Sequence, residues 1–123
     1  MGTENIVVHK DPNWHSAFPD IIRLGNGDLV VVFRQVPVHP GTGIKGDPHE
    51  TLVHHHEDPY SRLVIVRSID DGKTWGLPTV IDASDGTYDL NLAVVSEVSS
   101  GDLVVNSMRI FQDHAHDSAQ KLI

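Results

Sequence analysis

Short apolar runs separated by turn-forming residues dominate the chain, and no stretch repeats apolar residues with the period of a helix. The runs are rich in β-branched residues and are bounded by Gly, Pro, Asn and Asp, which is typical of strands joined by turns. They cover residues 6–8, 18–24, 29–33, 63–66, 79–81, 92–98 and 103–111. The pattern predicts an all-β fold.

One segment of the chain is repeated. "IIRLGNGDLVVVFR" (21–34) parallels "VVSEVSSGDLVVNSMR" (94–109), and both contain Gly-Asp-Leu-Val-Val. Each copy has the pattern of a strand, a tight turn and a second strand. Repetition of a β unit favours a propeller or a solenoid. The runs 29–33 and 63–66 are apolar at every position or nearly so, which is expected of strands that are buried on both faces.

The first repeating unit is expected to contain four strands and one long loop. The strands are 18–24, 28–35, 61–69 and 78–83, and the loop is 36–60. A second unit begins near Asn91 and supplies its first two strands before the sequence ends.

The octet "SIDDGKTW", which begins at Ser68, joins the third and fourth strands. The Asp70 carboxylate is placed to accept hydrogen bonds from backbone N–H groups that follow it. Gly72 can adopt a positive φ, and the hydroxyls of Ser68 and Thr74 can close the two sides of the turn. Trp75 is expected to bury its ring beneath the hairpin and fix the turn on the sheet.

With its Ser-x-Asp-x-Gly-x-Thr-Trp spacing, this octet resembles the Asp-box, or bacterial neuraminidase repeat. Together with "FPDIIRLGNGDLVVVFRQ" and "SRLVIVRSIDDGKTWGLPTVI", it makes residues 14–111 similar to the start of a sialidase-type six-bladed β-propeller. The resemblance implies about one and a half blades: blade 1 over 14–84, part of blade 2 over 85–123, and a ring-closing strand within 1–11. An Asp-box in another β fold is the alternative. In the family the Asp-box is structural and lies opposite the active site.

The topology of an up-and-down blade assigns the loops to two ends. The turn 25–27 and the octet fall at one end; the lead-in 14–17, the loop 36–60 and the segments 84–90 and 112–117 fall at the other. Eight of the nine histidines belong to this second end. They are His15, His39, His49, His54, His55, His56, His114 and His116.

Three interpretations of these histidines remain open. They form a solvated loop without a specific role, a pocket that hydrogen-bonds sugar hydroxyls or a carboxylate, or a metal site. The metal site would use His54, His56, Glu57 or Asp58 together with a distant histidine. Alternate residues of an extended segment point to opposite sides, so three consecutive histidines cannot all bind one ion. No motif of fixed metal-ligand spacing is present, and we predict no metal and no cofactor.

The sialidase resemblance implies specific site residues. It assigns Asp58 as the acid/base, a role that requires partial desolvation; the alternative is an Asp that starts a turn before Pro59. His15, His54, His56 and Arg34 are expected to surround the sugar. For Arg34, a structural salt bridge is the alternative.

One family feature is missing. The family's Phe/Tyr-Arg-Ile-Pro motif, whose arginine grips the substrate carboxylate, corresponds here to Ser16-Ala17-Phe18-Pro19. Ala17 therefore stands at the arginine position. Two functions stay open: a sialidase-like, exo-acting glycoside hydrolase, and a non-catalytic Asp-box module that binds glycan or protein.

The composition of the chain excludes some classes of partner. The net charge of −8 leaves no basic patch for nucleic acid, and no apolar stretch is long enough to cross a membrane. No signal peptide is visible, so the default expectation is the cytoplasm. One and a half blades would expose apolar faces, which predicts that the chain is a piece of a longer propeller and packs against its remainder.

Overall fold

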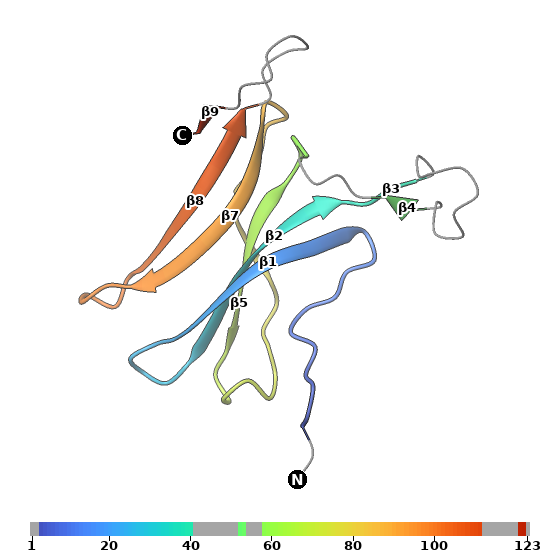
Figure 1. Ribbon diagram of the computed structural model, residues 1–123. Coiled ribbons are helices and arrows are strands. Elements are labelled where there is room, and N and C mark those ends of the chain that lie inside the picture. The colour runs from blue at the N-terminus through green and yellow to red at the C-terminus, as the bar shows by residue number, and fades with distance from the viewer. Residues whose placement is uncertain (1–2, 41–51, 54–57, 112–120, 123) are drawn as a thin grey trace.

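The computed structural model describes residues 3–40, 52–53, 58–111 and 121–122 (Figure 1). These residues form two antiparallel sheets and a short two-stranded ribbon. They contain no helix, and so none that could span a membrane. The strands are β1 (Trp14–Arg23), β2 (Leu29–Pro37), β3 (His39–Pro40), β4 (Leu52–Val53), β5 (Arg62–Ser68), β6 (Thr79–Ala83), β7 (Tyr88–Glu97), β8 (Leu103–Phe111) and β9 (Lys121–Leu122).

The first sheet is a meander with the order β1-β2-β5-β6, so each strand pairs with the next long strand of the sequence. This is the predicted four-strand unit, with two differences. β1 begins at Trp14 instead of 18, because a bulge between Ala17 and Asp20 allows the ladder to continue past Pro19. Phe18 has a φ of 53° within this bulge. The predicted loop 36–60 also contains the β3–β4 ribbon.

The second sheet has the order β7-β8-β9. Its β7–β8 hairpin repeats the β1–β2 hairpin, as the repeated sequence predicts. Gly27 and Gly101 occupy equivalent turn positions with φ values of 95° and 89°. β7 also contains a bulge, between Leu90 and Ala93, which lets the strand begin at Tyr88, earlier than the apolar run suggests.

The main core lies between the two sheets, which pack against each other along β1, β2 and β7 (Figure 1). Val32 and Leu63 of the first sheet contact a cluster that includes Leu90 and Val95 of the second. At one edge, the backbone N–H of Val95 donates to the Asp20 carboxylate over 2.9 Å and links β7 to β1.

The opposite face of the first sheet carries a second apolar cluster of Val31, Phe33, Val64 and Val66. Val8 and the Trp75 ring pack on this cluster. β2 and β5 are therefore buried on both faces, as their sequences predict.

Residues 3–11 form no strand. Within this segment the His9 ring lies 5.6 Å from the Phe33 ring, so the segment runs along the outer face of the first sheet. The described residues form no closed ring of blades, and the ring-closing role expected for residues 1–11 stays a prediction.

Candidate functional site

The octet that begins at Ser68 forms a tightly hydrogen-bonded turn between β5 and β6. The Ser68 Oγ donates to Asp70 Oδ1 over 2.8 Å and accepts from the Gly72 N–H over 2.8 Å. The Thr74 N–H donates to Asp70 Oδ1 over 2.8 Å, and the Thr74 hydroxyl donates to Oδ2 over 2.5 Å. Gly72 has a φ of 84°, and its carbonyl accepts from the Trp75 indole N–H over 3.1 Å. These are the contacts expected from the spacing of the octet.

Asp70 holds this turn together through its charged form. The hydrogen bonds from the Thr74 hydroxyl and N–H, followed by that from Ser68, lower the pKa of Asp70 from 3.8 to about 2. Because the pKa is lower in the folded protein, the carboxylate stabilises the fold fully above about pH 4. That contribution is lost as the pH falls from about 4 to about 2.

We expect the carboxyl carbon of Asp70 to titrate with a midpoint near pH 2 in an NMR pH titration of the folded chain. A midpoint for Asp70 near pH 4 would show that the hydrogen bonds of the turn do not favour the carboxylate in solution.

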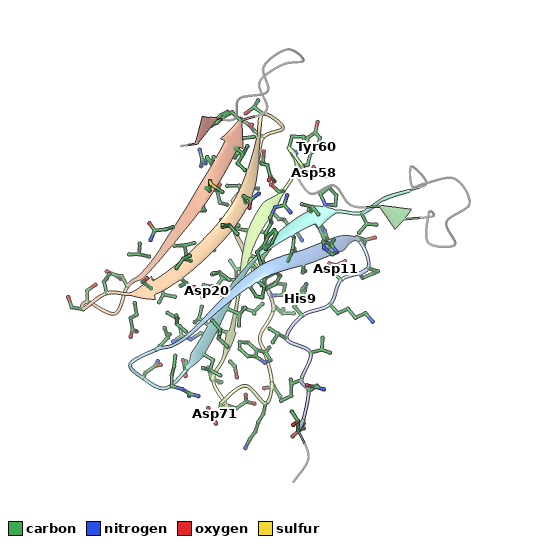
Figure 2. The ribbon with its side chains drawn as sticks, in the orientation of Figure 1. His9, Asp11, Asp20, Asp58, Tyr60 and Asp71 are labelled. Carbon is green, nitrogen blue, oxygen red and sulfur yellow. The ribbon has the colours of Figure 1, made fainter. Side chains whose placement is uncertain are left out.

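The two ends of the first sheet carry different groups. Figure 2 shows Asp58 and Tyr60 at one end and Asp71, within the octet, at the other. His15 belongs to the Asp58 end, since it pairs with Val36 close to where β2 finishes. The structure therefore separates Asp58 from the octet as predicted; His54 and His56 lie outside the described residues.

Arg34 is enclosed between the two sheets. Its side chain is 2% exposed, and its terminal nitrogen lies 2.7 Å from the carboxylate of Asp89, which is fully buried. Its Nε donates to the Leu90 carbonyl over 2.8 Å, and Asn91 donates to the second carboxylate oxygen of Asp89 over 3.1 Å. Arg34 therefore forms a structural salt bridge, which is the alternative given for it above. A contact between Arg34 and a sugar stays a prediction.

Asp58 is also buried, with 1% of its surface exposed. Its Oδ1 accepts from the Tyr60 N–H over 2.8 Å, and its carbonyl accepts from the Ser61 N–H over 3.2 Å. The Ser61 hydroxyl in turn accepts from the Leu90 N–H over 2.7 Å, which connects this turn to the second sheet. Asp58 thus stabilises the turn before β5, which is the alternative role given for it above. Its acid/base role stays a prediction.

A polar cluster at the same end of the sheet is not predicted by the sequence. The Arg62 guanidinium lies 3.6 Å above the centre of the Trp14 ring, and its Nε donates to Gln35 Oε1 over 2.9 Å. The Gln35 amide is fully buried and donates to the Ser16 hydroxyl over 3.1 Å. Burial lowers the pKa of Arg62, while the nearby charge of Asp11 raises it. The cluster joins three strands, and no local motif in the sequence marks it.

Two hollows adjoin the sheets. A groove of about 210 Å³ lies on the outer face of the first sheet, and its lining residues are Val8, His9, Ser16, Ala17, Pro19, Val31 and Phe33. A second hollow, of about 420 Å³, lies between the sheets near β6 and β8, where Arg109 and Asp82 approach to 3.2 Å.

No family model, curated protein or solved structure matches the chain. Within the described ranges, no group of three or more His, Asp or Glu side chains is arranged to hold a metal ion.

Proposed function

We propose that this chain forms the first part of a sialidase-like propeller that acts on glycans as an exo-acting glycoside hydrolase. The proposal is supported chiefly by one observation. An Asp-box-like turn joins the third and fourth strands of a four-stranded antiparallel meander, and Asp58 lies at the opposite end of this sheet. The packing of a second, repeated hairpin on this sheet is also what neighbouring blades require.

In this proposal Asp58 donates a proton to the glycosidic oxygen of the leaving group and later removes one from the attacking water. Arg34, His15, His54 and His56 contact the sugar. The nucleophile belongs to a later part of the propeller, because no residue of this chain matches it.

We expect Asp58→Asn to lower the turnover of a fluorogenic glycoside by at least about 100-fold in protein expressed at its native length. The Asn side chain retains an oxygen that can accept from the Tyr60 N–H, so the turn is preserved while the acid is removed. The assay compares a sialoside with other exo-glycosides.

Asp85→Asn is the matched control. Asp85 accepts from the N–H two residues ahead, that of Thr87, over 3.0 Å at the same end of the sheet, but its carboxylate is exposed. Turnover close to wild type in Asp58→Asn would remove Asp58 from the mechanism. Absence of hydrolysis for every glycoside would contradict the enzyme proposal itself.

The second candidate is a non-catalytic module that binds glycan or protein. Two observations favour it: Ala17 stands at the expected arginine position, and the guanidinium of Arg34 already forms an ion pair with Asp89. Binding to a glycan panel without any product release by the native-length protein would support this candidate over the hydrolase.

A further inference from the structure

The arginines of this chain differ in how they are neutralised. The chain has 17 acidic residues against nine Lys and Arg, so carboxylates are abundant. Four of its five arginines form ion pairs with aspartates: Arg23 with Asp71, Arg34 with Asp89, Arg67 with Asp28 and Arg109 with Asp82. Arg62 forms no ion pair with any residue that the structure describes.

Arg62 is nevertheless held in one orientation. Ser16, Gln35 and Arg62 are direct cross-strand neighbours on β1, β2 and β5, so their side chains share one face of the sheet. The hydrogen bond from Arg62 Nε to the buried Gln35 fixes the guanidinium plane, and the Trp14 ring supports that plane from one side. The two terminal amino groups make no hydrogen bond to the described residues.

A fixed guanidinium with both amino groups available is suited to bidentate pairing with an oxyanion. Its position is relevant to function, because Arg62 begins β5 at the end where Asp58 lies. Asp11 is a competing charge: it raises the pKa of Arg62, but the two side chains form no ion pair.

We propose that Arg62, supported by Trp14 and Gln35, binds the anionic group of an acidic sugar, a carboxylate or a sulfate. That the ligand is a sugar rests on the proposed glycan-directed function. That it carries an anionic group rests on the geometry of Arg62 alone. It assigns charge recognition to a residue outside the set expected from the sequence.

The test follows the Nε–Hε resonance of Arg62 by NMR in the full chain during titration with five probes. Galacturonate and galactose 6-sulfate carry the two candidate anions, galactose is the neutral sugar, and acetate and sulfate are the anions alone. We expect the acidic sugars to shift the Arg62 resonance and galactose to leave it unchanged.

The variant Arg62→Gln should bind the better acidic sugar at least about tenfold more weakly, because a charge-assisted hydrogen-bond pair is lost. Arg62→Lys keeps the charge without the planar fork and should recover only part of the affinity. Arg67→Gln, on the same strand but at the octet end, should bind like the wild type. If Arg62→Gln does not fold, the wild-type resonance and Arg62→Lys still decide the question.

The outcomes separate the two proposals. Sugar binding that is equal for galactose and galacturonate, with no shift at Arg62, would overturn the role of Arg62 and leave glycan binding intact. If acetate or sulfate shifts the Arg62 resonance and the acidic sugars bind no more tightly than these anions, the anion site is supported and a glycan ligand is contradicted. No shift with any anion would overturn the inference regardless of the sugar.

Discussion

Replacing Asp89 with asparagine is expected to lower the free energy of unfolding by about 3–5 kcal/mol. The Asp89 carboxylate is fully buried and neutralises Arg34, whose side chain is 2% exposed. Asn has nearly the same shape but no charge, so the variant removes the charge of Asp89 that faces the buried Arg34 guanidinium. Because this pair joins the two sheets, the loss should appear in the cooperative unfolding of both, which urea denaturation followed by circular dichroism measures.

The control removes an ion pair of the same type from the surface. Arg23 and Asp71 also approach to 2.7 Å, but their side chains are 55% and 70% exposed, so Asp71→Asn should cost no more than about 1 kcal/mol. Asn is suited to the positive φ of 63° at this position. The double variant Arg34→Met/Asp89→Leu removes both charges and should be more stable than Asp89→Asn. Equal losses for Asp89→Asn and Asp71→Asn would show that the pair is not buried in solution.

Replacing Leu90 with alanine is expected to lower the free energy of unfolding by about 2–5 kcal/mol. Leu90 lies on β7, is fully buried, and packs with Val32 and Leu63 of the first sheet. Shortening its side chain removes apolar contact and leaves a cavity between the sheets. The same urea denaturation experiment measures the loss.

Leu92→Ala provides the matched comparison, because Leu92 lies on the same strand and is 48% exposed. We expect its substitution to cost less than about 1 kcal/mol. Similar losses for the two variants would contradict the packing of the second sheet on the first through this strand.

Much of the fold follows from local sequence. The Gly-Asp-Leu-Val-Val repeats mark two hairpins because Gly27 and Gly101 supply the positive φ that each turn requires. The octet specifies its own hydrogen bonds, since Asp70 and its partners Ser68 and Thr74 are at most four residues apart. The sequence pattern predicts later starts for β1 and β7 than the structure shows, because the bulges after Ala17 and Leu90 interrupt the alternation on which strand prediction depends.

The candidate site was predictable only in part. Its end of the sheet follows from strand order, and Asp58 is indeed found opposite the octet. The surroundings of Arg34 and Arg62 did not follow from the sequence. One is buried against Asp89 and the other stacks on Trp14, and neither partner is its neighbour in the sequence.

By itself the sequence determined the all-β class, the strand-turn pattern and the internal geometry of the octet, because each depends on residues only a few positions apart. The tertiary structure alone decided which side chains the arginines contact. Arg34 and Asp89 are 55 residues apart, and Arg62 reaches Gln35 across a ladder. Such contacts depend on strand register and on how one sheet packs on the other, and a shift of one residue would turn each side chain to the opposite face.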